Sequence, residues 1–245
     1  MTKTRFYGYP LPGYEDSTKE LRGRLIVIEG TDGVGRSTQI ALLREWLEAN
    51  GYAVATTGMK RSLLAGEGIR AAMTGNYLDN TTMFLFYATD FADRLERDIM
   101  SALRAGFVVL TDRYIYSIIA RAQARGVDRD WIRNLLSFAI VPDLVLYLAS
   151  DVQHLLPRLL TSRGFDYWES GKDFLKDEDY YDAYVEYQTR LLAEFEGISQ
   201  EFGLHRIEAK RSIHEVFGDL RAEILKALTG MKPIASPAGF EEAAS

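Results

Sequence analysis

The sequence RLIVIEGTDGVGRSTQ, residues 24–39, joins three patterns in a row. Residues 25–28 are apolar and largely β-branched, which predicts a buried strand. A glycine-rich turn follows at residues 30–38, and apolar side chains then recur at helical spacing to about residue 50. A strand, a glycine loop and a helix in this order predict a phosphate-binding loop.

The glycine loop fits the pattern G-x-x-x-x-G-K-[S/T] except that Arg36 stands in place of the lysine. Glycines let the backbone turn its N–H groups toward phosphate oxygens. A basic side chain at position 36 would neutralise the β- and γ-phosphates, and Ser37 would reach a phosphate-bound Mg²⁺. The residues expected to bind the phosphates of a nucleotide are Gly30, Thr31, Asp32, Gly33, Val34, Gly35, Arg36, Ser37 and Thr38.

Two other interpretations of this loop stay open. One is a glycine-rich turn that matches the pattern by chance. The other is a phosphate loop that binds a nucleotide but no longer catalyses, because the planar guanidinium of Arg36 keeps the charge of lysine and not its shape.

The composition of the chain excludes several classes of protein. Its 245 residues, 47% of them hydrophobic, suit one α/β domain. A net charge of −6 argues against a nucleic-acid or polybasic membrane-binding protein. There is no cysteine for disulfides or a thiolate metal site, and no apolar run of transmembrane length. The first residues lack the apolar core of a signal peptide, so a cytoplasmic protein is expected.

Three parts of the chain differ in character. Residues 1–23 form an N-terminal arm rich in tyrosine, glycine and proline, without regular periodicity. This arm is either disordered or packs across a neighbour through Phe6, Tyr7 and Tyr9. Residues 24–229 form the predicted phosphate-loop domain. Residues 230–245 contain few core-forming side chains, which predicts a flexible tail.

Predicted strands and helices alternate through the central part. Strands are expected at residues 25–28, 52–57, 107–110, 143–148 and 205–209. Helices are expected up to residue 50 and at residues 65–73, 81–105, 116–125, 130–139, 152–161, 180–202 and 213–228. This alternation predicts an α/β fold: a parallel sheet flanked by helices, with ligands at the carboxyl ends of its strands.

A second motif, TDRYIYS at residues 111–117, follows the strand expected at residues 107–110. A carboxylate at the end of a buried strand near a phosphate loop, here Asp112, can hold a Mg²⁺ ion directly or through water. Arg113 beside it can bind a phosphate with two hydrogen bonds. The alternative for the Asp112–Arg113 pair is a cap on the following helix.

Five segments follow one another along the chain: EGTDGVGRSTQ, LFYATDFADRL, TDRYIYSIIA, VPDLVLYL and RGFDYWE. In this order they resemble the thymidylate kinase family of phosphate-loop kinases. The resemblance covers residues 24–228. It implies the P-loop kinase fold with a five-stranded parallel sheet and a mobile LID, ATP and Mg²⁺ as cofactors, a nucleoside monophosphate as acceptor, and a homodimer.

The resemblance also implies roles for single residues. Arg113 would hold the acceptor phosphate, Asp32 would lie near the acceptor sugar, and Tyr87 would stack on the base. Ser117 matches the family motif. In the bacterial form of the family the LID supplies a catalytic arginine, which in this chain would be Arg163 or Arg158. The alternative for these two is a pair of solvated charges at a helix end.

Departures from the family pattern fall on the expected acceptor side. Lys60 and Arg61 stand near the position where the family supplies charge for the acceptor phosphate. Phe91 replaces an arginine that reads the base, and Arg94 lies three residues farther along the same helical face. Ile118 replaces a polar residue and Arg121 an aromatic one. Fewer hydrogen bonds to the base should weaken or change the choice of base.

The sequence therefore predicts a thymidylate-kinase-like phosphotransferase whose acceptor is dTMP or a related nucleotide. A P-loop kinase with a different phosphate-bearing acceptor and a non-catalytic nucleotide-binding protein are the alternatives.

Overall fold

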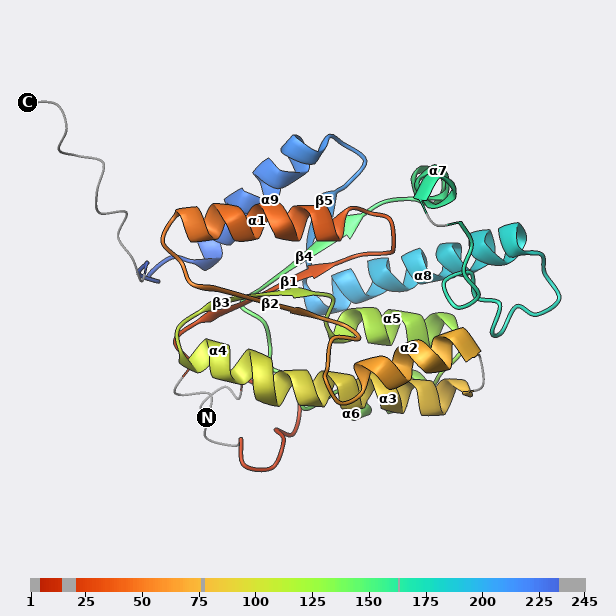
Figure 1. The fold of residues 1–245 in the computed structure, drawn as a ribbon, viewed down its shortest axis with the longest axis horizontal. Coiled ribbons are helices and arrows are strands. Elements are labelled where there is room, and N and C mark those ends of the chain that lie inside the picture. Colours follow the sequence, from red (N-terminus) through yellow and green to blue (C-terminus); the bar gives the residue numbers. More distant parts are fainter. Residues whose placement is uncertain (1–4, 15–20, 76–77, 163, 234–245) are drawn as a thin grey trace, which may run out of the picture.

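A computed structural model of the chain describes residues 5–14, 21–75, 78–162 and 164–233. A parallel sheet runs through the centre and helices cover both of its faces (Figure 1). The strand order is β2-β3-β1-β4-β5. The five strands are β1 (Arg24–Glu29), β2 (Val54–Gly58), β3 (Val108–Asp112), β4 (Leu144–Ala149) and β5 (His205–Glu208). The predicted five-stranded parallel α/β fold is confirmed.

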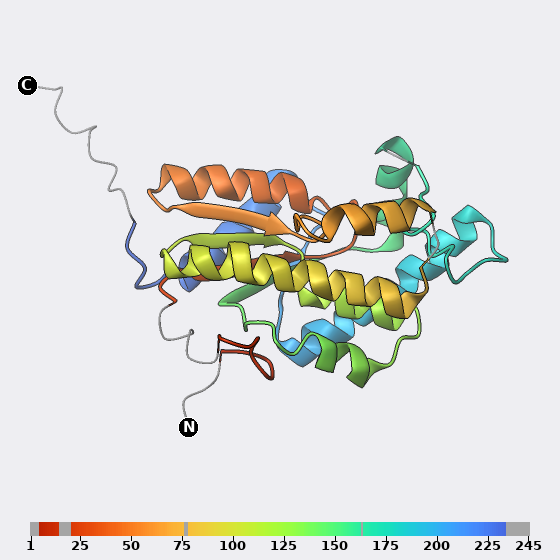
Figure 2. The ribbon, with the colours of Figure 1, turned by 60° about the horizontal axis from the view of Figure 1, so that its bottom comes forward.

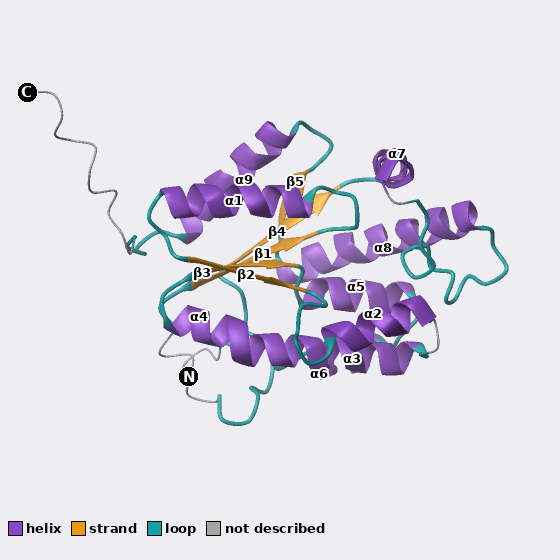
Figure 3. Ribbon diagram, viewed as in Figure 1, coloured by secondary structure: helices purple, strands orange, loops and turns teal. Residues whose placement is uncertain are grey.

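The helices connect the strands in the predicted alternation (Figure 3). They are α1 (Arg36–Ala49), α2 (Gly66–Gly75), α3 (Asn80–Arg94), α4 (Met100–Arg104), α5 (Ile115–Ala124), α6 (Arg129–Leu135), α7 (Val152–Ser162), α8 (Tyr180–Phe202) and α9 (Ile213–Ala227). None of the helices in these described parts is long and apolar enough to cross a membrane.

Each strand sends alternate side chains to opposite faces of the sheet, because successive residues of a strand point in opposite directions. Ile26 and Ile28 of β1 pack in the core beneath α1 and α9. Leu25 and Val27 pack in the larger core against α3, α4, α5 and α8. Strands buried on both faces account for the nearly continuous apolar runs in the sequence.

Two helices differ from the prediction, one in its interior and one at its end. The helix expected at residues 81–105 is one rod, but a π-helical turn at Leu95–Ile99 joins α3 to α4 (Figure 2). The helix expected at residues 130–139 stops four residues early, at Leu135. The reason is tertiary, since the backbone around Ile140 is extended and pairs with Phe6 of the N-terminal arm.

The described part of the arm packs on its own chain, which neither alternative from the sequence anticipated. Phe6 is buried, and the hydroxyl of Tyr7 lies 2.5 Å from that of Tyr116. The backbone N–H of Tyr7 donates to Ala139, while Tyr9 is exposed. The described part of the arm therefore covers one side of the larger core, next to Ile140 and Tyr116.

The strand ends bring the predicted site together. In the parallel register, Asp112 at the end of β3 is the partner of Ile28 on β1 and of Gly58 on β2. The phosphate loop starts one residue after β1. The loop, the β3 carboxylate and the segment after β2 thus share one edge of the sheet, as parallel topology requires.

Candidate active site

The loop between β1 and α1 has the backbone that its glycines permit. Gly35, the N-terminal cap of α1, has a φ of 102°, a left-handed conformation that a side chain disfavours. At Gly30 a Cβ atom would lie 2.8 Å from the carbonyl oxygen of Leu148, so no larger residue fits. In the described parts of the chain no side chain caps the first turn of α1, which leaves its N–H groups available to an anion.

Glu29 connects this loop to the segment TDRYIYS, residues 111–117, which we call the DRY motif. Its Oε1 accepts hydrogen bonds from the N–H groups of Tyr114 (2.8 Å) and Ser117 (3.2 Å). Its Oε2 accepts from the hydroxyl of Ser117 at 2.5 Å. Burial raises the pKa of Glu29, although these hydrogen bonds oppose the rise. The carboxylate holds the start of α5 at a fixed distance from the phosphate loop.

The loss of stability on replacing Glu29 should therefore depend on whether the new side chain can still pair with the N–H groups of Tyr114 and Ser117 and with the Ser117 hydroxyl. Glu29→Ala is expected to lower the free energy of unfolding by about 3 kcal/mol or more, because it strands several buried donors. Glu29→Gln keeps an oxygen for the N–H groups and an amide for the hydroxyl, so a loss of about 1 kcal/mol or less is expected. Urea denaturation measures both, and equal losses would contradict this role.

A cavity of about 210 Å³ opens at the edge of the sheet beside the loop. Basic side chains from four segments line it: Arg36, Lys60, Arg61, Arg113 and Arg121. Acidic and other lining residues are Asp32, Asp112, Ser37, Gly58, Met59 and Tyr87. We call it the acceptor cavity. An excess of cations in a half-enclosed space favours a multiply charged anion.

Arg36 is buried against the loop from which it projects. Its Nε donates to Asp112 Oδ1 at 2.8 Å, and its Nη1 donates to the carbonyl oxygens of Gly30 (2.5 Å) and Thr31. The charges of Asp112 and Asp32 outweigh the effect of burial and raise the pKa of Arg36. The guanidinium thus holds the loop and the end of β3 together.

Asp32 lies among three arginines. Its Oδ1 accepts from Arg113 Nη2 at 2.5 Å, and its Oδ2 accepts from Arg121 Nη2 at 2.7 Å. Arg36 Nη2 is 3.6 Å from the same carboxylate. Burial would raise the pKa of Asp32, but these positive charges hold it well below its usual value. Burial and the charge of Arg36 lower the pKa of Arg113, while the charge of Asp32 opposes this shift.

These low pKa values predict a pH dependence of stability. Burial raises the pKa of Asp112, but its contact with Arg36 lowers it below the usual value, as happens at Asp32. A carboxyl with a depressed folded pKa stabilises the fold above its unfolded pKa, about 3.9, and this contribution is lost as the pH falls through the folded pKa. Asp32→Asn should therefore flatten the loss of thermal stability below about pH 4. The exposed Asp177→Asn is the control, and identical profiles for all three proteins would contradict the prediction.

Ser37 and Asp112 both line the acceptor cavity and a second cavity of about 470 Å³ beside α1. A hydroxyl and a carboxylate are oxygen ligands of the kind that Mg²⁺ accepts together with substrate phosphates. This donor set fits the ion expected from the sequence.

The segment after β2 places Lys60 and Arg61 on the acceptor cavity. Lys60 has a φ of 63°, which a non-glycine residue rarely adopts. The carboxylate of Asp90 on α3 accepts from the N–H groups of Lys60 (3.1 Å) and Ser62 (3.0 Å) and fixes this turn. Burial lowers the pKa of Lys60. Strained backbone held by outside hydrogen bonds is typical of functional sites.

Tyr87 also lines the acceptor cavity, where the sequence expects a stacking platform. Its ring packs against Phe84, with centroids 5.9 Å apart, and its hydroxyl donates to the sulfur of Met73 at 3.7 Å. The residue is almost fully buried, so the aromatic surface is held rigidly by α2 and α3.

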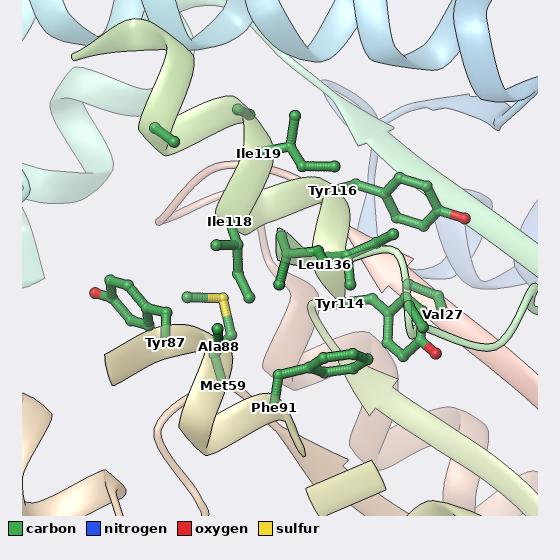
Figure 4. Close-up of a cluster of buried hydrophobic side chains, with 14 of the residues drawn as sticks. Val27, Met59, Tyr87, Ala88, Phe91, Tyr114, Tyr116, Ile118, Ile119 and Leu136 are labelled. Carbon is green, nitrogen blue, oxygen red and sulfur yellow. The ribbon is translucent and has the colours of Figure 1, made fainter. Parts of the chain in front are cut away.

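Four of the residues expected to contact the substrate are not among those that line this cavity. Phe91 and Ile118 are fully buried, and Phe91 packs edge-on against Tyr114 with centroids 4.9 Å apart (Figure 4). Arg94 forms a buried ion pair with Asp90 at 3.0 Å. Ser117 donates its hydroxyl to Glu29. Apolar side chains at the first two positions are drawn into the core, and Arg94 is used to hold the Asp90 carboxylate.

The other end of the loop faces α7. Arg158 on α7 donates from Nη1 to the carbonyl oxygen of Gly33 at 3.3 Å. It lines a cavity of about 160 Å³ together with Thr38, Gln39 and residues at the start of α9. Arg163, the second candidate arginine, lies outside the described residues. The loop therefore separates two cavities, one toward α5 and one toward α7.

Sequence reasoning gave no role to three carboxylates that the structure brings to the site. Glu29 holds the loop, Asp90 holds the turn at Lys60, and Glu169 contacts Arg121 at 3.0 Å. All three fall within quoted motifs: Glu29 in EGTDGVGRSTQ, Asp90 in LFYATDFADRL and Glu169 in RGFDYWE. An acidic residue inside such a motif was the available signal.

Comparison with known proteins agrees with this geometry. The family described as thymidylate kinase matches residues 28–219. "Probable thymidylate kinase 2" of Saccharolobus solfataricus is 36% identical over 203 residues, 82% of this chain and 95% of the relative. "Probable thymidylate kinase" of Thermococcus gammatolerans is 33% identical over 208 residues, 81% and 94% of the two chains. "Thymidylate kinase" of Brachyspira hyodysenteriae is 31% identical over 160 residues, 65% and 79%.

The match extends across the phosphate loop, the DRY motif and most of the sheet, and the first two of these relatives are covered nearly from end to end. With a five-stranded parallel sheet and a cationic cavity at the loop, the chain belongs to the thymidylate kinase family.

Proposed function

We propose that this protein transfers the γ-phosphoryl group of ATP to dTMP or a closely related nucleoside monophosphate. The observation that carries the proposal is the acceptor cavity, in which five basic side chains surround a space that begins at the phosphate loop and is bounded by Tyr87. The cationic end of the cavity suits the phosphate of a nucleoside monophosphate, and the aromatic wall suits its base.

The acceptor cavity and the cavity beside Arg158 would supply separate places for acceptor and donor. The donor phosphates would lie along the loop and the N-terminus of α1, with the donor base toward Thr38 and Arg158. The acceptor phosphate would lie at Arg113, and the acceptor base against Tyr87. The γ-phosphate would then lie between the two, at Arg36 and Ser37.

In this arrangement an oxygen of the acceptor phosphate attacks the γ-phosphorus, and the bond from that phosphorus to the β–γ bridging oxygen breaks, which releases ADP. Two anions must approach each other for this step. Arg36 and Arg113 would offset their repulsion and the charge that spreads over the transferred group. Arg158 reaches the loop from the opposite side. Ser37 and Asp112 would hold Mg²⁺, which when bound neutralises further phosphate charge.

A second candidate is a protein that binds nucleotides without transferring phosphate. The specific observation in its favour is the engagement of Arg36 with Asp112 and two loop carbonyls, which must be released before the guanidinium can reach a phosphate. The matched ADP-release assay below separates the two.

The test is a coupled ADP-release assay with ATP, Mg²⁺ and dTMP, with dUMP, dCMP, dGMP and dAMP in parallel. Turnover on dTMP is the expected result. Turnover confined to another monophosphate would keep the kinase and replace its acceptor. Nucleotide binding by calorimetry without turnover on any of them would overturn the proposal in favour of the binding protein.

We also propose a homodimer. Exposed apolar side chains lie on two neighbouring elements, Leu63 and Leu64 before α2, and Leu85 and Phe86 on α3. Such a surface is typical of a subunit interface. Light scattering after size-exclusion chromatography should give twice the chain mass, and Leu85→Glu should give the monomer.

A further inference from the structure

The segment 164–179, which connects α7 to α8, is attached to the end of α5 by two arginines one helical turn apart. Arg121 contacts Glu169, and Arg125 contacts Asp173. Each pair joins an arginine at the end of α5 to a carboxylate of this segment. They differ in the other contacts of the arginine: Arg125 contacts core residues, whereas Arg121 contacts Asp32 of the phosphate loop. This difference suggests separate roles for the two pairs.

Arg125 fixes the segment to the core. Its guanidinium binds both oxygens of Asp173 at 2.8 and 3.1 Å and the carbonyl oxygen of Trp168 at 2.8 Å. It also donates to the hydroxyl of Tyr187 at 2.6 Å and lies 4.0 Å from the centre of the Trp168 ring. A buried cation with this many partners is a structural anchor.

The backbone at Glu169 is held independently of its own side chain. Its N–H donates to Asp166 Oδ1 at 2.7 Å, and its carbonyl oxygen accepts from Gln188 on α8 at 3.1 Å. The side chain is therefore not needed to keep the segment in place. Its carboxylate, in a residue that is 4% exposed, contacts Arg121, which lines the acceptor cavity.

Arg121 connects that carboxylate to the phosphate loop. Its Nη2 donates both to Glu169 Oε2 (3.0 Å) and to Asp32 Oδ2 (2.7 Å), while its buried Nη1 has no hydrogen-bond partner among the described residues. Arg113 donates to the other oxygen of Asp32. The two arginines thus bind the two oxygens of one carboxylate, the arrangement in which a pair of arginines can bind one phosphate. Arg121 Nη1 is a further donor for a third phosphate oxygen.

We propose that Glu169 is a positioning residue for the acceptor: it keeps Arg121 at the cavity wall so that Arg121 and Arg113 together grip the acceptor phosphate when this phosphate takes the place of the Asp32 carboxylate. A free arginine side chain would lose rotamer entropy on binding, and a permanent carboxylate partner removes much of that loss beforehand. This inference rests on the proposed acceptor.

The first experiment measures the steady-state kinetics of Glu169→Gln. We expect the KM for dTMP to rise about tenfold, with the KM for ATP within about twofold of the original. The effect should pass through Arg121, so the double variant with Arg121→Gln should be no worse than Arg121→Gln alone. Effects that multiply in the double variant, or an unchanged or lower KM for dTMP, would overturn the inference.

Asp173→Asn is the matched control, because it breaks the neighbouring pair in the same segment. It should lower the melting temperature and leave the KM for dTMP within about twofold, since Arg125 does not line the cavity. If it raises the KM for dTMP as much as Glu169→Gln does, the role of Glu169 is only structural.

A binding measurement keeps this test separate from the test of the kinase activity. Calorimetric titration with inorganic phosphate should show about tenfold weaker binding to Glu169→Gln than to the original protein. If no monophosphate is phosphorylated but this difference is found, the proposed function fails and the positioning role stands. Equal phosphate affinity in the two proteins would reject the positioning role whatever the turnover.

Discussion

Arg36→Ala should lower kcat by about 100-fold, the effect expected when one preorganised group that stabilises developing charge is removed. This loss corresponds to about 2.7 kcal/mol of transition-state stabilisation. The residue is the basic side chain of the phosphate loop, and it lies between Asp112 and the loop carbonyls, where a γ-phosphate would arrive. ADP release under saturating ATP and acceptor measures kcat directly.

Arg36→Lys is the control for this experiment. Lysine restores the loop pattern and the charge, so most of the activity should remain, whereas the bonds to Asp112 and two carbonyls cannot all be kept by one ammonium group. Melting temperatures show whether either variant loses the link between the loop and β3. An unchanged kcat in Arg36→Ala would mean that another cation, such as Arg158, neutralises the γ-phosphate.

Arg113→Ala should lower kcat/KM for the acceptor by about 100-fold, in the range found when one member of a buried charge pair is removed. Arg113 donates to Asp32 and lines the acceptor cavity. The loss should appear when dTMP is varied and much less when ATP is varied. A loss confined to the KM for ATP would place this arginine on the donor.

The backbone of Arg113 offers a control that separates charge from strain. Its φ is 72°, a conformation that costs a non-glycine residue about 1–2 kcal/mol. Arg113→Gly should therefore be more stable than Arg113→Ala by about 1 kcal/mol, while both lose the same catalytic efficiency. Urea denaturation measures the first and steady-state kinetics the second. Equal stability would show that the backbone relaxes when the side chain is removed.

Patterns confined to short stretches were the ones that could be predicted. The apolar run of β1, the glycines of the loop and the helical spacing of α8 each reflect a local requirement, because a buried strand, a tight turn and an amphipathic helix constrain the residues that form them. The predicted helix at residues 180–202 agrees with α8, and Asp112 falls at the carboxyl end of β3. The motif order identified the family.

Side chains whose partners are distant in sequence could not be placed in this way. Phe91 and Arg94 occupy positions where a base-reading arginine was expected, yet one packs on Tyr114 and the other pairs with Asp90. Helix α6 ends at Leu135 and not at the predicted residue 139, because Phe6 of the N-terminal arm pairs with Ile140 in the chain that follows. Such outcomes depend on how elements pack, and no local pattern records them.

The amino-acid sequence by itself determined the parallel sheet, the phosphate loop at the end of its first strand and the class of ligand, because backbone conformation and burial impose their demands residue by residue. Only the tertiary structure decided which charges meet. Asp32, Arg113, Arg121 and Glu169 come from the loop, the DRY motif, α5 and the segment before α8. Electrostatic contacts act over a few ångströms in space whatever the distance along the chain, so the fold alone could bring these four together.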